Sequence, residues 1–386
     1  MKRALLIVLD SVGIGHAPDA AKFGDQGANT LGHIRETVPG FSIPTLDQAG
    51  LVCAEALAAG KPVPDSPTSM SFGSLIERSA GKDTTAGHWE MAGAPVIEPF
   101  STFDRFPDEL VAEMEVASGV SFIGNYAQSG TTILEELGEE HLRTGHPILY
   151  TSADSVIQIA AHESTTPLES LYRICRACRK IADRERIGRV IARPFTGVIG
   201  SFVRTKNRHD FSLVPPATVL TRLSESGVHT IGVGKINDIF AGAGIESSYP
   251  TADNNEGCAV IDQQLAATHR TPHLIFANLV DFDMHFGHRR DPQGYADALE
   301  SFDRWFNSLL PRLNDDILVM ITADHGNDPT WHGTDHTREQ VPLLVRAPGL
   351  PRNLGVRKSY ADIAASLADW FEISAEGLAG ESFLGA

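Results

Sequence analysis

Short apolar runs rich in β-branched residues recur along the chain and constrain its fold more than any other feature. They cover residues 4–9, 229–233, 273–280, 317–322 and 341–346. Such runs are typical of buried strands in a largely parallel sheet. Helical patterns lie between them, including apolar residues at three- and four-residue spacing from Ala296 to Leu313, and Ser359 with Asp362 resembles a capping box that opens a last helix. Alternation of strand and helix predicts a doubly wound α/β sandwich.

The middle of the chain follows a different pattern. Helical segments at 107–119 and 168–182 are mixed with short extended pieces at 148–161, 188–195 and 197–205. We interpret residues 98–215 as an α+β domain inserted into the sandwich, which leaves residues 1–97 and 216–386 as the two parts of the core. Pro215 and Pro216 are suitable linker residues.

Charge and composition exclude several classes of partner. The chain has 386 residues and a formal charge of −17, which argues against nucleic acid, because binding to its phosphates depends on a basic surface. No apolar run approaches the roughly 18 residues of a membrane span, and the apolar segment near Met1 is too short for a signal peptide. The 4 cysteines form no disulfide framework. We therefore expect a cytoplasmic protein with no membrane partner and no obligate protein partner.

Polar side chains follow the apolar runs at the points where the strands should end. They are Asp10, the segment DFDMHFGH (281–288), the segment ADHGN (323–327) and the segment GTDH (333–336). In open α/β sheets such residues converge beyond the carboxyl ends of the strands. Taken alone, Asp10 suits a turn cap and 281–288 a solvated loop. Together, carboxylates and imidazoles without cysteine suit Mn²⁺ or Zn²⁺, and two ions about 3.5–4 Å apart can assist phosphoryl displacement.

No nucleotide-binding signature accompanies these residues. The segment SVGIG lacks the third glycine of a dinucleotide fingerprint, and no GxxxxGK[ST] loop occurs. The segment GKDTTAGHWE (81–90) instead offers the hydroxyls of Thr84 and Thr85 in a glycine-bracketed turn. Coordination to a dication would activate such a hydroxyl as a nucleophile, and a helix N-cap is the alternative role. The sequence therefore predicts a dinuclear phosphoryl-transfer site.

Long motifs in this sequence resemble the phosphopentomutase family of the alkaline phosphatase superfamily. They cover residues 10–20, 81–90, 150–163, 188–195, 278–295 and 321–339. The resemblance implies an alkaline-phosphatase-like core with an inserted α+β cap, and interconversion of the 1-phosphate and 5-phosphate of ribose or 2-deoxyribose. It also implies two Mn²⁺ ions, with Zn²⁺ or other divalent ions as alternatives, a phosphothreonine, and glucose 1,6-bisphosphate or ribose 1,5-bisphosphate as activator.

The resemblance also implies roles for individual residues. One ion is expected to bind Asp10, Asp324, His325 and the oxygen of Thr84, and the other Asp283, His288 and His336. Thr84 is favoured over Thr85 because the family's phosphorylated threonine directly follows a Lys-Asp pair. The expected sugar-phosphate contacts are Ser152, Asp154, Val156, Arg189 and Ile191 in the cap and Lys235 in the core. The segment 322–339, called the ligand-rich stretch, contains four further polar residues that are expected to shape it, namely Asp328, His332, Asp335 and Glu339.

Other functions share parts of this pattern. A metal-dependent phosphatase or a phosphoglycerate-mutase-like enzyme of the same superfamily would keep the metal ligands and differ in the cap. A catalytically silent metal-binding sensor of sugar phosphates would never become phosphorylated on Thr84. Conversion of ribose 5-phosphate separates the mutase from the first alternatives, and phosphorylation of Thr84 separates it from the last.

Overall fold

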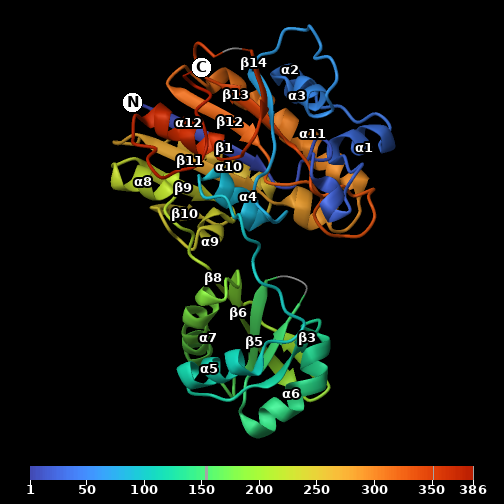
Figure 1. Cartoon of the computed structure of the whole chain (residues 1–386), viewed down its shortest axis with the longest axis vertical. Coiled ribbons are helices and arrows are strands. Elements are labelled where there is room, and N and C mark those ends of the chain that lie inside the picture. The colour runs from blue at the N-terminus through green and yellow to red at the C-terminus, as the bar shows by residue number, and fades with distance from the viewer. Residues whose placement is uncertain (153–154, 351, 386) are drawn as a thin grey trace. The chain divides into compact units, whose positions relative to one another are not determined.

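The structure is a computed structural model that describes residues 1–152, 155–350 and 352–385. The chain divides into two compact units (Figure 1). Unit 1 comprises Met1–Glu98 and Pro215–Ala386, and unit 2 comprises Pro99–Val214. The chain therefore leaves unit 1 once and returns to it, so unit 1 is built from two distant parts of the sequence.

An eight-stranded sheet forms the centre of unit 1 among the described residues. In spatial order its strands are β10 (Ser247–Tyr249), β9 (His229–Val233), β11 (His273–Leu279), β1 (Arg3–Leu9), β12 (Ile317–Thr322), β13 (Val341–Arg346), β2 (Ser71–Leu75) and β14 (Asn353–Arg357). The residues of β1, β11 and β12 are buried almost without exception, as expected for strands covered on both faces. Each of the five apolar runs forms a strand of this sheet.

Strand β13 departs from the parallel arrangement that the sequence suggested. It pairs antiparallel with β12 on one side and with β2 on the other. A parallel neighbour of β12 would need a crossover that returns the chain to the opposite edge of the sheet, usually through a helix. The loop 323–340 contains no such helix, so β13 begins at the edge where β12 ends. Both ends of the ligand-rich stretch consequently stay at one edge.

Helices cover both faces of this sheet (Figure 1). One group consists of α1 (Thr30–Thr37), α2 (Pro44–Ala49), α3 (Leu51–Ala58), α10 (Asn254–Ala266) and α11 (Pro292–Leu309). The other consists of α4 (Thr84–Met91), α8 (Val219–Glu225), α9 (Ile236–Ile239) and α12 (Asp362–Phe371). The predicted α/β sandwich is confirmed.

Two details of these helices differ from expectation. Helix α11 ends at Leu309 and a short 3-10 turn follows at Leu310–Arg312, because Pro311 cannot continue the helical hydrogen bonding. Helix α12 has no side-chain N-cap, so the expected capping box is absent. The Ser359 hydroxyl instead donates to Glu90 at 2.8 Å.

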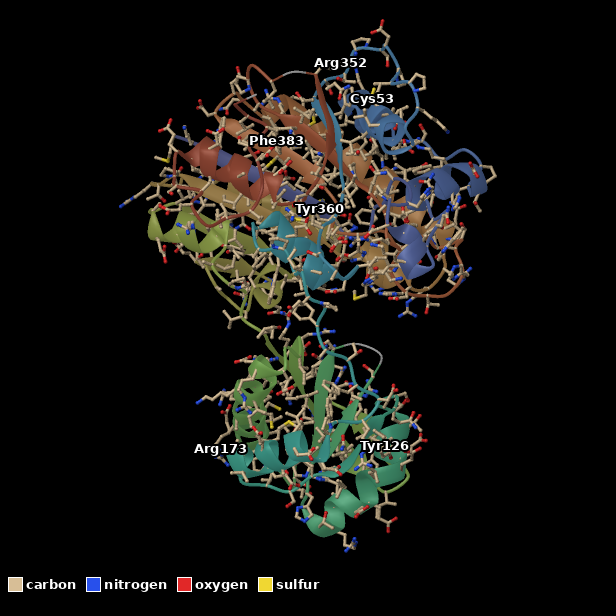
Figure 2. The ribbon with its side chains drawn as sticks, in the orientation of Figure 1. Cys53, Tyr126, Arg173, Arg352, Tyr360 and Phe383 are labelled. Atoms are coloured by element: carbon tan, nitrogen blue, oxygen red, sulfur yellow. The ribbon has the colours of Figure 1, made fainter. Side chains whose placement is uncertain are left out.

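The segment after α12 packs back onto unit 1. Phe383 is 1% exposed, and its backbone N–H donates to the Ser366 hydroxyl at 3.0 Å (Figure 2). Within the described residues, no helix is both long and apolar enough to cross a membrane.

Unit 2 is an α+β structure with its own core. Its sheet has the order β3 (Ile123–Ala127), β4 (Ile148–Thr151), β5 (Val156–His162), β6 (Arg189–Val198) and β7 (Ser201–Arg204), with β8 (His209–Ser212) also paired to β6. Helices α5 (Asp108–Ser118) and α7 (Leu168–Arg184) share one apolar cluster with the sheet. Helix α6 (Thr132–Thr144) contributes to a second cluster that includes Tyr150 and Phe195.

Candidate active site

The ligand-bearing segments meet at one edge of the sheet in unit 1. Asp10 follows β1, Asp283 lies in the π-helical turn Phe282–Gly287 after β11, and Asp324 follows β12. These three strands are adjacent and parallel, so their carboxyl ends share an edge. Segments separated by more than 250 residues in the chain thereby become neighbours.

Asp10, Asp324 and His325 form a first group of potential metal ligands. One ligand atom from each lies within 4.8 Å of the others. His325 Nε2 lies 3.5 Å from Asp10 Oδ1 and 3.4 Å from Asp324 Oδ2. Among the described residues these two carboxylate oxygens have no hydrogen-bond partner, although both are buried. Burying a charged oxygen without a partner is costly, so a cation suits this position.

Asp283 and His336 form a second group with the same His325. His336 Nε2 lies 3.4 Å from Asp283 Oδ1. His288 extends this group, because its Nε2 lies 3.2 Å from Asp283 Oδ2 and 3.2 Å from His336 Nε2. His325 is thus close to both groups, whereas the family resemblance implied a role in the first alone.

The three imidazoles share one hydrogen-bonding scheme. Each Nδ1 lies within hydrogen-bond distance of a backbone carbonyl, which favours the tautomer with the proton on Nδ1. The pairs are His325 with Gly326 at 3.0 Å, His336 with Lys82 at 3.1 Å and His288 with Thr334 at 2.6 Å. When the imidazoles are neutral in this tautomer, each Nε2 has a lone pair to offer a cation beside the carboxylates, as a metal ligand does.

The electrostatics of the cluster also favour a cation. Burial, followed by the charges of Asp324 and Asp283, raises the pKa of Asp10 well above its ordinary value. Burial opposes ionisation of Asp283, but hydrogen bonds from His288 and His336 outweigh it and lower the pKa of Asp283. A hydrogen bond to Asp283 raises the pKa of His288 to about 9. Divalent cations would relieve the repulsion among the carboxylates and replace the protons.

Thr84 places a hydroxyl at the first group. It is the first residue of α4, and its Oγ1 lies 3.1 Å from His325 Nε2. Asp83 caps the helix by accepting from the backbone N–H groups of Thr85 and Ala86 at 3.0 and 3.1 Å. The N-cap is therefore Asp83, and the Thr84 hydroxyl has no capping role.

Comparisons with known proteins identify the family of this chain. The Metalloenzyme superfamily model matches residues 2–375. Phosphopentomutase of Caldanaerobacter subterraneus subsp. tengcongensis is 52% identical over 379 residues, which cover 97% of this chain and 95% of the relative. Phosphopentomutase of Syntrophotalea carbinolica is 49% identical over 388 residues, covering 99% of this chain and 97% of the relative.

The chain belongs to the phosphopentomutase family. It is therefore an enzyme of the isomerase class, and the resemblance seen in its motifs is confirmed. Among solved structures, Leishmania mexicana phosphoglycerate mutase shares 12% identity, with 98% of this chain and 97% of that chain covered and a TM-score of 0.47.

Additional side chains orient the candidate ligands of this phosphopentomutase-family chain, and the sequence analysis did not single them out. Asn278 donates to Asp10 Oδ2 at 3.0 Å, and Asn327 donates to Asp283 Oδ1 at 2.7 Å. His88 is fully buried, and its Nδ1 lies 2.8 Å from the Thr84 carbonyl and 3.2 Å from Asp324 Oδ2. The available signal was their position, since all three lie in the same motifs as the ligands.

The four residues expected to shape the loop 323–340 contact backbone and side chains of neighbouring segments. Asp328 accepts from the Asn29 N–H at 3.1 Å and lies 2.5 Å from His33 Nδ1. Glu339 accepts from the N–H and hydroxyl of Thr30 at 2.9 and 2.7 Å. His332 Nε2 lies 3.0 Å from the Gly24 carbonyl, and Asp335 lies 3.4 Å from the Lys82 ammonium group.

Those expected sugar-phosphate residues of unit 2 that the structure describes lie at one end of its sheet. Val156 pairs with Arg189 in parallel register, and Ser152 directly follows β4, which is antiparallel to β5. Arg189 Nη1 lies 3.6 Å from Asp210 Oδ2. Val156 and Ile191 are 3% and 2% exposed, so little of either side chain is accessible.

Two predicted contacts remain. Asp154 lies outside the described residues. Lys235 follows β9 in unit 1 and is exposed, and its charge acts to lower the pKa of Asp10 and of Asp281. Lys235 therefore places a positive charge near the carboxylate edge of the sheet.

Proposed function

We propose that this enzyme interconverts the 1-phosphate and 5-phosphate of ribose or 2-deoxyribose and that Thr84 carries the phosphoryl group between them. The observation that supports this most directly is the 3.1 Å separation of Thr84 Oγ1 and His325 Nε2 beside Asp10 and Asp324, each of which has one buried carboxylate oxygen that accepts no hydrogen bond from the described residues. A hydroxyl at a helix N-terminus and next to cation ligands is suited to phosphoryl transfer.

Mn²⁺ is the metal we assign to the two ligand groups. Asp10, Asp324, His325 and Thr84 would bind one ion, and Asp283, His288 and His336 the other. Oxygen and nitrogen donors without sulfur fit this ion, and Zn²⁺ is the nearest alternative. When bound, the metal ions neutralise charge on the phosphoryl oxygens and lower the pKa of the threonine hydroxyl.

The residues of the chain then divide the reaction into two transfers. In the first, the bond between the Thr84 oxygen and phosphorus breaks, and a bond forms from phosphorus to the free C1 hydroxyl of the 5-phosphate, which loses its proton. The resulting 1,5-bisphosphate turns around. In the second, the Thr84 oxygen takes the phosphoryl group from C5, and the C5 oxygen regains a proton. A bisphosphorylated sugar, such as glucose 1,6-bisphosphate or ribose 1,5-bisphosphate, supplies the first phosphoryl group.

Binding of the sugar phosphate is the role we assign to unit 2, through Ser152, Asp154, Val156, Arg189 and Ile191, with Lys235 contributing from unit 1. Arg189 lies two residues before Ile191 and Arg193 two residues after it. Because alternate residues of a strand point to the same side, the two arginines share one face of β6. Guanidinium groups bind phosphate through paired hydrogen bonds, which supplies local positive charge in an acidic protein. We also propose a cytoplasmic location, which agrees with four buried free cysteines.

Thr84→Ala compared with Thr85→Ala tests the nucleophile. The protein is incubated with glucose 1,6-bisphosphate and Mn²⁺, the phosphopeptide is mapped, and turnover of ribose 5-phosphate is measured. We expect phosphate on Thr84 and a loss of turnover by several orders of magnitude in Thr84→Ala, because uncatalysed phosphate-ester cleavage is very slow.

The adjacent substitution is the matched control. Thr85→Ala also removes a threonine hydroxyl, from the next residue of the same helical turn. This variant should retain turnover within a few-fold. Wild-type turnover in Thr84→Ala would overturn the assignment. Steady release of inorganic phosphate without mutase product would overturn the reaction.

A further inference from the structure

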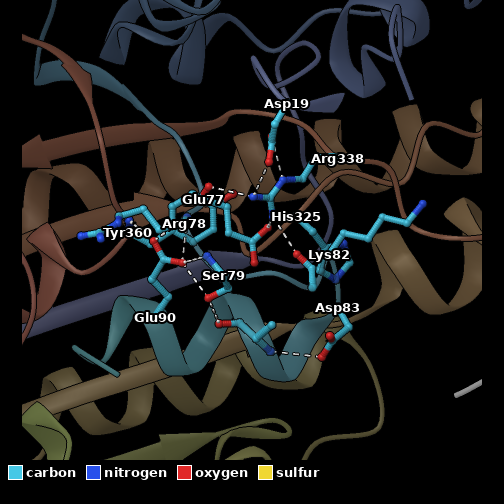
Figure 3. A network of polar contacts seen from close by, with 12 residues as sticks. Asp19, Glu77, Arg78, Ser79, Lys82, Asp83, Glu90, His325, Arg338 and Tyr360 are labelled. Carbon is cyan, nitrogen blue, oxygen red and sulfur yellow. Dashed lines mark hydrogen bonds and ion pairs between the residues drawn. The ribbon is translucent and has the colours of Figure 1, made fainter. Parts of the chain in front are cut away.

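The guanidinium group of Arg338 connects the two loops that form the candidate site. Arg338 is 2% exposed. It donates to Glu77 Oε2 at 2.6 Å, to the Glu77 carbonyl at 2.8 Å and to the Gly81 carbonyl at 2.6 Å (Figure 3). It also forms a paired contact with Asp19, at 3.1 Å to each carboxylate oxygen. All of its hydrogen-bonding nitrogens are therefore used within the protein.

Two of the partners of Arg338, Glu77 and Gly81, lie in the loop 76–83, which leads from β2 directly into Thr84. Arg338 itself lies in the loop 323–340, two residues after His336. His336 approaches the same short segment, since its Nδ1 lies 3.1 Å from the Lys82 carbonyl. Two side chains of the loop 323–340 thus bind consecutive carbonyls of the loop 76–83. Arg338 binds the Gly81 carbonyl, and His336 binds the Lys82 carbonyl.

The other end of the loop 76–83 is bound by helix α4 itself. Glu90 is fully buried and accepts from the N–H groups of Arg78 and Ser79 and from the Ser79 hydroxyl, at 2.6 to 2.9 Å. Its carboxylate also accepts from the N–H of Tyr360 at 3.0 Å (Figure 3). Glu90 anchors the start of the loop, and Arg338 together with His336 connects its later residues to the loop 323–340.

The contacts made at position 338 require the guanidinium group of an arginine. The planar guanidinium has five N–H donors in fixed directions, and here they reach two carboxylates and two carbonyls. A lysine ammonium group retains the charge but is a compact donor that cannot reach all of these acceptors together. Lysine at this position should preserve the buried ion pair with Glu77 while releasing Gly81.

We infer that Arg338 is a positioning residue that holds the loop 76–83 so that the Thr84 hydroxyl stays at the Asp10, Asp324 and His325 group. This inference rests on the proposed role of Thr84. Arg338 touches neither the reacting atoms nor the candidate ligands. Its effect is therefore on the orientation of Thr84 and should appear in the rate of phosphoryl transfer.

Arg338→Lys is the test, with Arg35→Lys as a matched control. Arg35 also contacts two carboxylates, Asp47 at 2.5 Å and Glu55 at 3.1 Å, but in helices away from the loop 76–83. For Arg338→Lys we expect kcat and the rate of Thr84 phosphorylation by glucose 1,6-bisphosphate to fall about 100-fold, because small misplacements of reacting groups have effects of that size. KM and bound Mn²⁺ should stay near the wild-type values. Arg35→Lys should leave the rate unchanged.

A second measurement does not depend on activity. Amide hydrogen exchange of peptides covering 76–84 should become faster in Arg338→Lys and remain unchanged in Arg35→Lys. Wild-type rate and exchange in Arg338→Lys would overturn the inference, as would a rate loss fully accounted for by lost Mn²⁺. If wild-type protein converts no ribose phosphate while exchange still responds, the proposed function fails and the loop connection stands.

Asp19→Asn provides a milder variant if Arg338→Lys does not fold. Asp19 is 32% exposed, and its loss leaves the contacts of Arg338 to Glu77 and Gly81 in place. We expect a smaller decrease in the same rate with unchanged bound Mn²⁺. An unchanged rate together with unchanged exchange in 76–84 would count against the inference.

Discussion

The histidines of the candidate site differ in how many of the two ligand groups they approach. His325 is 1% exposed, and its Nε2 lies within reach of Asp10, Asp324 and the Thr84 hydroxyl. It also belongs to the group that contains Asp283. His288 is 40% exposed and approaches the second group alone. Removal of these two imidazoles should therefore have unequal effects.

His325→Ala should weaken retention of both metal ions, and His288→Ala should weaken one. Loss even of residues that orient metal ligands costs about 10- to 100-fold in affinity, so loss of a ligand should cost at least tenfold. Metal analysis after dialysis measures the effect. His285→Ala is the control, because this neighbouring histidine is exposed and lies 4.0 Å from Asp281 instead. Equal metal content in His325→Ala and His285→Ala would contradict the assignment.

Secondary-structure elements fix which edge of the sheet each side chain occupies. The parallel register of β1 with β11 and β12 places Asp10 and Asp324 together, and the reversal at β13 keeps His336 with them. The opposite end of β11 begins with His273, which is 2% exposed, and its Nε2 has no hydrogen-bond partner among the described residues. The start of β11 is therefore expected to make the free energy of unfolding depend on pH.

Burial, assisted by the charge of His269, lowers the pKa of His273 from 6.5 to about 4. The unfolded chain therefore binds a proton between pH 6.5 and 4 that the folded chain does not, so the free energy of unfolding decreases as pH falls through this window. The decrease attributable to this group is roughly 3 kcal/mol at most. His273→Gln should flatten this acid limb in urea titrations. The exposed residue His16 is the control, and an equally flat limb in His16→Gln would refute the attribution.

The two units can be followed separately in the intact protein. All four tryptophans, Trp89, Trp305, Trp331 and Trp370, lie in unit 1. Tryptophan fluorescence therefore reports unfolding of unit 1, whereas calorimetry reports both units. The candidate metal ligands likewise come from unit 1 and join the ends of β1, β11 and β12.

Mn²⁺ should stabilise unit 1 selectively. At a free concentration about 100 times Kd, a ligand that binds only the folded state adds about 2.7 kcal/mol, which corresponds to a rise in Tm of roughly 5 °C for a unit of this size. Chelation should reverse the shift. Asp283→Asn, which weakens one group of ligands, should reduce it. A fluorescence Tm that does not respond to Mn²⁺ in the wild-type protein would contradict the metal assignment.

The sequence alone predicted the features that depend on local pattern. Apolar runs identified the five strands, and the positions just after them made Asp10, Asp324 and His325 candidate ligands, because burial of a strand and the edge position of its last residue are local properties. The family resemblance then selected Thr84 from two adjacent threonines. The apolar patterns of the sequence did not indicate strands β2 and β14, because these short segments carry weak patterns.

Tertiary structure decided the features that depend on which distant segments meet. Strand order, the reversal of β13, the approach of His325 to both ligand groups and the contact of Arg338 with Gly81 all join residues far apart in the chain. Hydrophobic periodicity specifies which face of an element is buried but not its partner. The capping box failed for the same reason, since the Ser359 hydroxyl is bound by Glu90, a residue that no local pattern connects with it.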